Sequence, residues 1–408
     1  MSIPNIPRAV LNLTAARLRH AAHHWHGVSK ELARAGRHLR RRQEIVQHAP
    51  AHARRRIQRS KAAMLRTRNR WTRFDDHVLQ PYAVERRVKR RLARAASGSG
   101  PIVVGPWTSE VGYEALYWIP FLHWAIDHYR IDPRRVIAIS RGGTEDWYRG
   151  IAGHYVDIFD CIGTEAFAAE MRMRREQGDQ KQSIASPLDN RLVSLAADRL
   201  GLQAPAVWHP GLMYELLRAF WYGDRALQFL LRHTDFGRAR TALASALREP
   251  AHGLPVLPAE YAAVKFYTGP SLPNAPEVRA ALVRAVERLA AGMPVVMLDT
   301  AWSVDEHKDY TFDHIRGVTT LRPSLDPRTN LQLQTRVIAG AQLFVGTCGG
   351  LAWLAPLLGV ETIAVYEDDR FLTPHLYAAR YAYRYSGAAT FSTLNLRALA
   401  SGAVRAHA

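Results

Sequence analysis

The sequence predicts an α/β fold with two doubly wound domains in tandem, preceded by a basic α-helical N-terminal extension. Three observations predict it. The chain has 408 residues, of which 48% are hydrophobic, and this is enough to fill two cores. After residue 100, short apolar runs alternate with longer amphipathic ones, which is typical of parallel strands covered by helices. Before residue 100, the chain is rich in Ala, Arg and Leu and contains long stretches without Gly or Pro.

The net charge of +19 is confined to the first quarter of the chain. Residues 1–100 hold 24 Lys/Arg and 5 Asp/Glu, whereas residues 101–408 hold 31 of each. Residues 1–96 are therefore predicted to be a basic helical extension, and the Ser-Gly-Ser-Gly run 97–100 is its linker. Such a segment could bind nucleic-acid phosphates, anionic lipid head groups, or other helices.

Residues 101–250 are predicted to form the first α/β domain. Its strands are expected in four apolar runs, which begin at residues 101, 135, 155 and 206. The first helix is expected over about residues 113–129, directly after the first strand and a polar loop. A connector with Pro255 and Pro258 at its end leads to the second domain.

Residues 255–385 are predicted to form the second α/β domain, followed by a C-terminal tail over 386–408. Its strands are expected in apolar runs that begin at residues 261, 294, 317, 343 and 361. Its helices are expected at about residues 275–291, 331–341, from about 350 onward, and 374–385.

The two cysteines, Cys161 and Cys348, are far apart in sequence and lie in apolar runs, which favours a reducing compartment over a disulfide framework. No apolar stretch near the N-terminus is long enough for a secretory signal. Residues 337–360 carry no charge, but their glycines and Pro356 predict a strand, a turn and a helix there rather than a membrane span. We therefore expect a cytoplasmic protein, placed at the inner face of the membrane if its basic segment binds lipid.

The strand, turn and helix at residues 343–358 are the most informative feature of the sequence. Gly349 and Gly350 have no side chain to obstruct a ligand, and a helix that begins after them would present free N–H groups. The hydroxyl of Thr347 could add a hydrogen bond. The arrangement suits a diphosphate, although the same glycines could serve only to pack a tight turn.

The run F-V-G-T-C-G-G-L-A-W-L-A-P-L-L-G-V at 344–360 resembles the C-terminal domain of GT-B glycosyltransferases, in the group that includes fucosyltransferase-like and heptosyltransferase-like enzymes. The resemblance covers roughly residues 101–385 and implies two Rossmann-like domains, with a nucleotide-sugar donor in the cleft between them. The first domain would take the acceptor. It also implies transfer that needs no metal and no cofactor beyond the nucleotide-sugar. The chain lacks the E-x7-E pattern of many retaining GT-B enzymes, so the resemblance favours an inverting mechanism.

A loop over residues 105–114 follows the first predicted strand, at the edge where doubly wound sheets bind ligands. An inverting transfer needs a base for the acceptor hydroxyl, and Glu110 is the predicted base because it resembles the loop carboxylate of heptosyltransferase-like enzymes. Glu114, one helical turn later, could contact the sugar or acceptor. Either residue could instead cap the first helix.

Further residues could line the same cleft. Lys265 interrupts an apolar strand and could offset the charge of the leaving diphosphate, or it could reach solvent from the strand end. Asp305 and His307 lie in a polar loop and could grip the sugar, and we predict no metal site there. His209 could line the acceptor side or be a satisfied core histidine.

The resulting hypothesis is an inverting glycosyltransferase that moves a sugar to a hydroxyl of a surface glycan or a lipid-linked saccharide, as in polysaccharide biosynthesis. A sugar-nucleotide epimerase or a pyruvyl transferase would use the same cleft. A nucleic-acid-binding protein with a catalytically silent α/β scaffold is a third alternative. Beside a glycosyltransferase-like body, whose acceptors are often lipid-linked, the basic extension favours an anionic membrane surface over nucleic acid as its partner.

Overall fold

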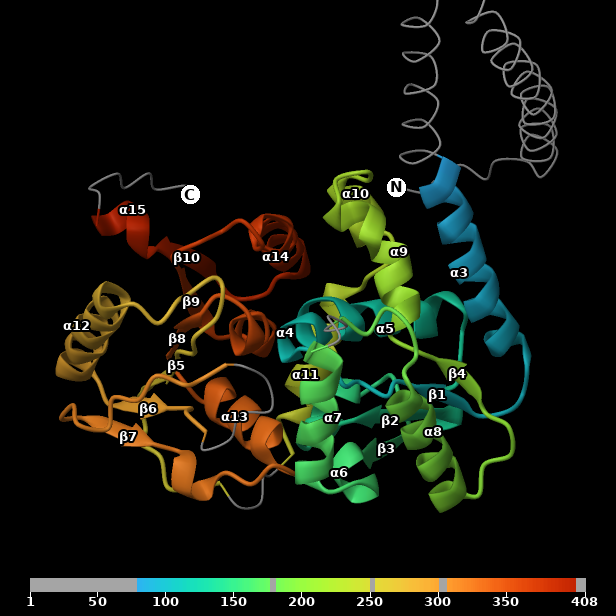
Figure 1. The fold of residues 1–408 in the computed structure, drawn as a ribbon, viewed down its shortest axis with the longest axis horizontal. Helices are drawn as coiled ribbons and strands as arrows, with labels where there is room; N and C mark the ends of the chain where they lie inside the picture. The colour runs from blue at the N-terminus through green and yellow to red at the C-terminus, as the bar shows by residue number, and fades with distance from the viewer. Residues whose placement is uncertain (1–78, 177–180, 250–253, 301–306, 401–408) are drawn as a thin grey trace, which may run out of the picture. The chain divides into compact units, whose positions relative to one another are not determined.

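In the computed structural model, the residues described are 79–176, 181–249, 254–300 and 307–400, and they belong to one compact unit. The unit has two lobes, each built on a parallel sheet (Figure 1). The two-domain α/β fold expected from the alternation of apolar runs and helices is therefore confirmed.

The first lobe contains a four-stranded sheet in the order β3-β2-β1-β4. Its strands are β1 Ile102–Val104, β2 Val136–Ser140, β3 His154–Asp157 and β4 Ala206–Trp208. All of their pairings are parallel, and the first of them aligns Ile102 with Val136. Because parallel sheets are covered on both faces, β1 and β2 are buried along their whole length.

Helices cover both faces of this first sheet. In chain order they are α4 Val111–Tyr113, η3 Glu114–Trp118, α5 Ile119–His128, η4 Pro133–Arg135, η5 Thr144–Tyr148, α6 Ile158–Cys161, α7 Thr164–Glu176, α8 Pro187–Leu200, α9 Gly211–Trp221, α10 Leu227–Leu231 and α11 Phe236–Ala246. The single helix expected over 113–129 is thus divided by the π-helical segment η3. Helix α8 shows how local sequence sets an element, because Ser186 and Asp189 form a capping box and Gly201 ends the helix in the left-handed region.

The second lobe contains a six-stranded parallel sheet in the order β10-β9-β8-β5-β6-β7. Its strands are β5 Ala262–Lys265, β6 Val295–Met297, β7 Val318–Thr320, β8 Leu343–Thr347, β9 Glu361–Tyr366 and β10 Phe391–Asn395. Its helices are α12 Pro276–Gly292, η6 Arg322–Ser324, α13 Asn330–Ala339, η7 Gly350–Ala352, η8 Ala355–Leu358, α14 Thr373–Ser386 and α15 Leu396–Ala400.

Three predictions about the elements are corrected. Residues 391–395, placed in a C-terminal tail, form strand β10 on the edge of the second sheet beside β9. The helix expected from residue 350 is two short 3-10 turns, η7 and η8, because Pro356 lies at the start of the second turn and Gly359, at a φ of 85°, ends it.

The third correction concerns the basic extension. Helix α3, Gln80–Ser97, lies at the end of the segment predicted to be separate, yet it packs on α9 of the first lobe. Its Val88 and Leu92 are fully buried in the core. The remainder of the predicted extension, up to residue 78, lies outside the described residues.

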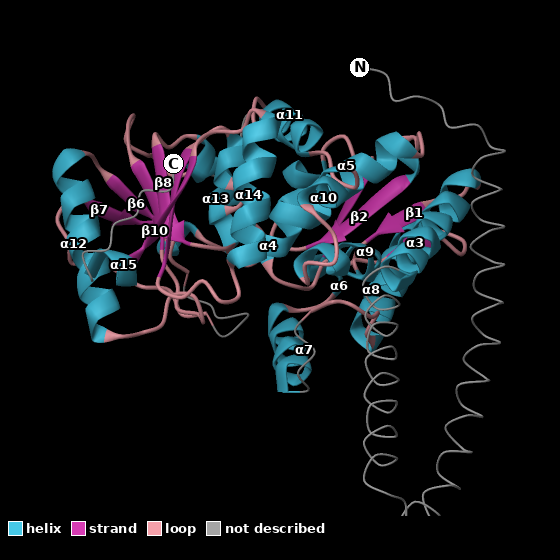
Figure 2. Ribbon diagram, turned by 90° about the horizontal axis from the view of Figure 1, so that it is seen from above, coloured by secondary structure: helices cyan, strands magenta, loops and turns pink. Residues whose placement is uncertain are grey.

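One hydrophobic cluster joins the two lobes. It holds Ile102 and Val104 of the first sheet together with Ala263 and Phe344 of the second. Figure 2 shows helices α11, α13 and α14 between the two sheets. Helix α14 lies between β9 and β10 of the second sheet in sequence but contacts α9, α10 and α11 of the first lobe. The lobes are therefore held together by shared packing at their base.

Candidate active site in the cleft between the lobes

The carboxyl ends of both sheets open on the same cleft, which consists of two adjoining cavities. The smaller cavity has a volume of about 430 Å³ and the larger about 690 Å³. Both are lined by residues of both lobes. The residues they share are Glu110, Gly112, Arg141, Tyr267, His307 and Gly350. These residues mark the junction at which two bound molecules would meet.

Glu110 lies at this junction. It follows β1 and is the residue before α4, and its backbone carbonyl accepts hydrogen bonds from the N–H groups of Tyr113 and Glu114. Its side chain makes no capping hydrogen bond and is exposed. Glu110 therefore lines both cavities and does not cap the helix through its side chain.

Gly349 and Gly350 also reach the cavities, from the turn after β8. Gly349 has a φ of 136° and Gly350 a φ of 45°, in the region that favours glycine. A Cβ atom on Gly349 would lie 2.6 Å from the hydroxyl of Tyr267. The N–H groups of Gly350 and Leu351 precede the first hydrogen bond of the turn, which Ala352 donates to the Gly349 carbonyl.

This turn differs from the predicted diphosphate site in one respect. Because η7 contains only three residues, it lacks the summed dipole of a long helix, and any attraction for phosphate rests on individual N–H groups. The first lobe approaches closely here, since a Cβ atom on Gly112 would lie 2.8 Å from the Gly350 nitrogen. The absence of side chains on Gly112 and Gly350 thus allows the two lobes to approach closely at the bottom of the cleft.

Thr347 does not have the role expected of it. Its side chain is almost fully buried, and its hydroxyl donates to the Tyr267 carbonyl at 3.0 Å and accepts from the Tyr267 N–H at 2.8 Å. A hydroxyl has one hydrogen to donate, and here that hydrogen is used within the protein. Thr347 therefore joins the ends of β5 and β8 and positions Tyr267, which lines both cavities.

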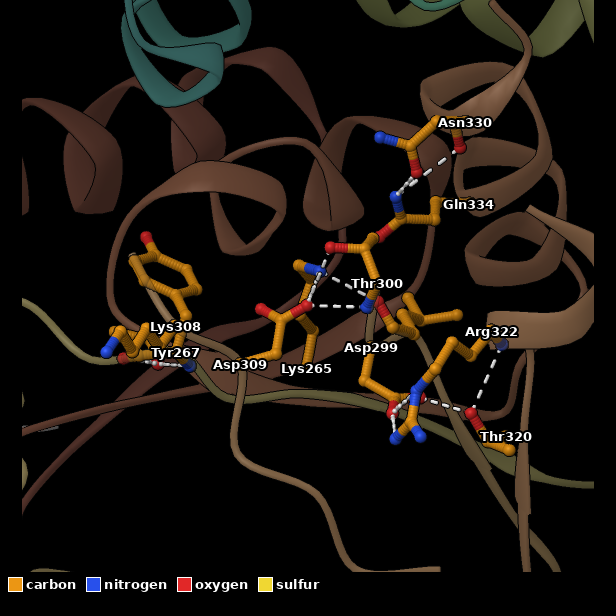
Figure 3. Close-up of polar contacts among 12 residues, drawn as sticks. Lys265, Tyr267, Asp299, Thr300, Lys308, Asp309, Thr320, Arg322, Asn330 and Gln334 are labelled. Carbon is orange, nitrogen blue, oxygen red and sulfur yellow. Dashed lines mark hydrogen bonds and ion pairs between the residues drawn. The ribbon is translucent and has the colours of Figure 1, made fainter. Parts of the chain in front are cut away.

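Lys265 ends strand β5 and lines the smaller cavity. Figure 3 shows its contact with Asp309. Its ammonium group donates to the Leu298 carbonyl at 2.7 Å and contacts Asp309 Oδ2 at 3.1 Å. The same carboxylate oxygen accepts from the N–H and the hydroxyl of Thr300 at 2.6 and 3.0 Å. An ammonium group has three hydrogens, so among the described residues Lys265 retains one donor beyond these two contacts.

His307 lies beside Tyr267, with 4.7 Å between their ring centroids, and lines both cavities. Its Nδ1 donates to the Thr268 carbonyl at 2.7 Å, which directs Nε2 away from the main chain. The structure therefore brings His307 to the site as predicted. Asp305, its predicted neighbour, lies outside the described residues.

Glu114 is not a cleft residue, which corrects the expected contact with sugar or acceptor. It is fully buried, and its Oε1 accepts hydrogen bonds from Ser140 at 2.6 Å and Tyr148 at 2.7 Å. Burial raises the pKa of Glu114 to about 7, against the opposing charge of Arg141. Glu114 therefore connects helix η3 to Ser140 at the end of β2, and it does not line the cleft.

His209 is likewise a buried structural residue and lines neither cavity. Its Nδ1 accepts from the Gly211 N–H at 3.0 Å, and its Nε2 lies 3.3 Å from Asp189 Oδ2. Burial raises the pKa of Asp189, but hydrogen bonds from His209 and Ser186 outweigh it and lower the pKa overall. This corrects the predicted acceptor contact in favour of the core histidine.

The larger cavity has four arginine, lysine or histidine side chains that were not predicted: Arg141, Arg174, Lys181 and His375. Arg141 directly follows β2, so the rule that identified Glu110 could have found it. Arg174 lies inside helix α7, and no local sequence pattern points to it. His375 lies in α14, and both of its ring nitrogens form hydrogen bonds. Nε2 lies 2.9 Å from the Tyr113 hydroxyl and Nδ1 lies 2.6 Å from the Tyr117 hydroxyl.

Burial lowers the pKa of His375 to about 3, so its ring is neutral near pH 7. Because Tyr113 and Tyr117 belong to the first lobe, these hydrogen bonds with His375 connect the two lobes beside the larger cavity.

Within the described residues, no group of three or more His, Cys, Asp or Glu side chains could hold a metal ion. No helix in that part of the chain is long and apolar enough to cross a membrane.

No family model matches the chain, and no curated protein does. Solved structures that match include the heptosyltransferase WaaC of E. coli with ADP, at 18% identity over 66% of this chain and 88% of that chain, with a TM-score of 0.37. A UDP-GlcNAc 2-epimerase from Methanocaldococcus jannaschii matches at 10% identity over 70% and 91%, with a TM-score of 0.34.

The iron-containing dodecameric glycosyltransferase TibC of enterotoxigenic E. coli matches at 14% identity over 65% of this chain, with a TM-score of 0.32. The match spans 58% of the TibC chain. Likenesses at these identities and TM-scores say nothing of substrate or reaction. The structure itself gives two lobes with parallel sheets whose carboxyl ends face one cleft, and this is the arrangement of two α/β domains that the resemblance implied.

Proposed function

We propose that the protein is an inverting glycosyltransferase, which moves a sugar from a nucleotide-sugar to a hydroxyl of a surface glycan or lipid-linked saccharide. The observation that carries the proposal is the placement of Glu110, an exposed carboxylate at the junction of two cavities. One cavity can hold a donor and the other an acceptor, so that the reacting atoms meet beside a group able to take a proton.

The smaller cavity suits the nucleotide part of the donor. Its lining includes the uncharged polar side chains of Thr300, Asn330 and Gln334, which can bind a base or a ribose. Lys265 lies in the same lining, and Gly350 brings its N–H group to the border of the larger cavity. The diphosphate would lie between Lys265 and Gly350, with the sugar directed toward Glu110.

In the proposed reaction, Glu110 accepts the proton of the acceptor hydroxyl as its oxygen forms a bond to the anomeric carbon. The bond from that carbon to the diphosphate oxygen breaks on the opposite face, and the nucleoside diphosphate leaves with the bonding electron pair. The remaining hydrogen of the Lys265 ammonium and the N–H groups of the η7 turn stabilise the developing negative charge. Attack and departure on opposite faces invert the anomeric configuration.

The first experiment is a thermal-shift panel of nucleoside diphosphates and nucleotide-sugars on the full chain. We expect one nucleoside diphosphate and its sugar to raise the melting temperature, because a ligand that binds only the folded state stabilises it. An unchanged melting temperature across the panel would count against a donor site. With the donor known, NMR analysis of the product shows whether the sugar is transferred with inversion, epimerised, or left intact while another group is transferred.

The base is tested with Glu110→Gln. We expect turnover to fall by about 10²- to 10⁴-fold while donor affinity is unchanged, because the amide cannot take the proton. The matched control is Glu145→Gln, which removes an exposed carboxylate of the first lobe that lines neither cavity. Full turnover in Glu110→Gln would show that another group is the base.

We also propose that the basic N-terminal segment attaches the protein to an anionic membrane surface at the cytoplasmic side. Support comes from its charge and from exposed arginines of α3, including Arg86, Arg90 and Arg94. The full chain should sediment with vesicles that contain anionic lipid and not with neutral ones. Equal binding to both vesicles, or salt-sensitive binding to duplex DNA alone, would reject the membrane and favour nucleic acid.

A further inference from the structure

The larger cavity contains a buried cation whose hydrogen-bonding capacity is only partly used. Arg174 is 8% exposed, and its Nη1 donates to Thr108 Oγ1 at 2.9 Å. Its Nε and Nη2 are buried and have no hydrogen-bond partner within the described part of the chain. A desolvated guanidinium with unused donors is unfavourable unless an anion or another acceptor completes it.

The identity of the two unused nitrogens is informative. Nε and Nη2 lie on the same edge of the guanidinium, and their N–H bonds run parallel. This edge matches two oxygens of one phosphate or one carboxylate in a bidentate pair. A single carbonyl or hydroxyl would satisfy only half of it.

No carboxylate of the described residues pairs directly with Arg174. The nearest link runs through Thr108, whose hydroxyl donates to Asp189 Oδ1 at 3.2 Å. Asp189 is already occupied, because it accepts hydrogen bonds from the Ser186 N–H at 2.8 Å and from Gln182 at 2.8 Å. Thr108 thus holds the guanidinium in place without neutralising it.

Two further side chains that line the larger cavity, those of Arg141 and Lys181, are positively charged like Arg174. Arg141 lines the cavity with its guanidinium bonded to the Trp107 and Ser109 carbonyls, at 3.1 and 2.6 Å. Lys181 lies over the ring of Tyr113, 5.4 Å from its centroid. The charged residues that line the larger cavity are therefore three cations, Arg141, Arg174 and Lys181, and one carboxylate, Glu110.

The lining of the smaller cavity contains more negatively than positively charged side chains. Its charged lining consists of two cations, Arg141 and Lys265, and three carboxylates, Glu110, Glu165 and Asp309. An anionic group on a molecule that enters the cleft is therefore favoured in the larger cavity, on the wall of the first lobe. That wall is the acceptor side of the proposed function.

We propose that the larger cavity contains a subsite for an anionic group of the acceptor, a phosphate or a carboxylate, which Arg174 binds through Nε and Nη2 and Lys181 supports. The inference rests on the proposed function for the word acceptor, but the anion subsite stands on the geometry of Arg174. Because both nitrogens are closed to bulk solvent, the guanidinium has to shift toward the cavity to bind the anion. Acceptors without a negative charge would bind more weakly.

The test measures binding of inorganic phosphate to the full chain by isothermal titration calorimetry at constant ionic strength. The variants are Arg174→Gln and its control Arg172→Gln, an exposed arginine on the same helix. We expect phosphate affinity at least about tenfold lower in Arg174→Gln and unchanged in Arg172→Gln, since a bidentate charged pair is worth a tenfold change or more. Equal affinity in all three proteins would overturn the subsite.

Two further variants protect the test against misfolding. Arg174→Lys keeps the positive charge but loses the paired N–H donors of the guanidinium. Its phosphate affinity should therefore lie between those of the wild type and Arg174→Gln. Lys181→Gln removes an exposed charge without touching the core and should lower phosphate affinity severalfold. If neither Arg174→Lys nor Lys181→Gln weakened phosphate binding, the subsite would be rejected, even if Arg174→Gln failed to fold.

A second arm separates the two sources of an anion. ADP and UDP are titrated into the wild type and Arg174→Gln. An unchanged affinity for the nucleoside diphosphate, together with lost phosphate binding, supports an acceptor subsite. A parallel loss would assign Arg174 to the donor diphosphate and overturn the acceptor assignment. If no nucleoside diphosphate of the thermal-shift panel bound the wild type, the proposed function would fail while the phosphate result still decided the anion subsite.

Discussion

Arg336 of α13 pairs with Asp146 of the opposite lobe, with 2.8 Å between Arg336 Nη2 and Asp146 Oδ2. The two side chains are only 9% and 11% exposed. Arg336 also donates to the main-chain carbonyl of Glu249 at 2.7 Å, and next to Asp146 the Trp147 indole donates to Thr335 at 3.0 Å. The lobes are therefore fixed to one another by directed polar contacts as well as by shared apolar packing.

Asp146→Asn should destabilise the protein by about 3 kcal/mol, because it leaves the buried Arg336 without its counter-charge. The free energy of unfolding from urea denaturation at pH 7 measures the effect. The control is Asp127→Asn, which breaks the exposed pair with Arg238, where side chains are 52% and 58% exposed, and should cost less than about 1 kcal/mol. Equal losses in the two variants would contradict the account.

Glu114 should make stability depend on pH. Because its folded pKa of about 7 exceeds the usual 4.5, the folded protein keeps a proton that the unfolded chain releases between those values. The resulting stabilisation is complete below about pH 4.5 and is lost as the pH rises through 7. Its size is about 3 kcal/mol at a little over one kcal/mol per pKa unit.

Glu114→Gln isolates this contribution, since the amide oxygen can still accept from Ser140 and Tyr148 while the group no longer titrates. The difference in the free energy of unfolding between variant and wild type should move in favour of the variant between pH 5 and pH 8. Urea denaturation at both pH values measures it. A difference that did not change with pH would show that Glu114 titrates normally.

Gly349→Ala should weaken nucleoside diphosphate binding more than about tenfold. The new Cβ atom would displace the Tyr267 hydroxyl, 2.6 Å away, at the junction of the cavities. The control is Gly359→Ala, where φ is also positive but no atom lies within 4 Å of the added Cβ. Both variants carry the backbone strain of about 1–2 kcal/mol, and only the first should lose affinity. Calorimetry with both variants would reveal an equal loss if strain alone were responsible.

Leu92→Ala should cost about 2–5 kcal/mol, because Leu92 of α3 is fully buried against the first lobe. Arg90→Ala, on the exposed side of the same helix, should change stability by less than about 0.5 kcal/mol. Thermal or urea denaturation of the full chain compares them. If both changes were small, residues 80–97 would be a detachable extension after all.

The sequence was sufficient for the central strands because they are buried on both faces and appear as continuous apolar runs, as in Val136–Ser140. Strand β10 was missed for the opposite reason. Its run F-S-T-L-N has three polar residues among five, lies on the edge of the sheet and resembles a loop. The 3-10 turns after Gly349 were mistaken for a helix because an apolar run of that length fits both.

The site was predictable only where a residue follows a strand. Glu110 and Gly350 meet at the cleft because the carboxyl ends of parallel strands share an edge. Whether Glu110 or Glu114 faces the cleft depends on the path of one helical turn, which the sequence does not specify. Arg174 reaches the cavity from within a helix, and its place depends on the packing of α7 against the rest of the first lobe.

Helix α14 has a consequence for the order in which the chain matures. Its Tyr383 packs edge-on against Phe236 of α11, and Ser386 accepts a hydrogen bond from Arg240 at 3.1 Å. A ribosome would release the first lobe more than a hundred residues before these partners emerge. Until then this aromatic surface of the first lobe is exposed to solvent, so the cleft between the lobes forms only in the last steps of synthesis.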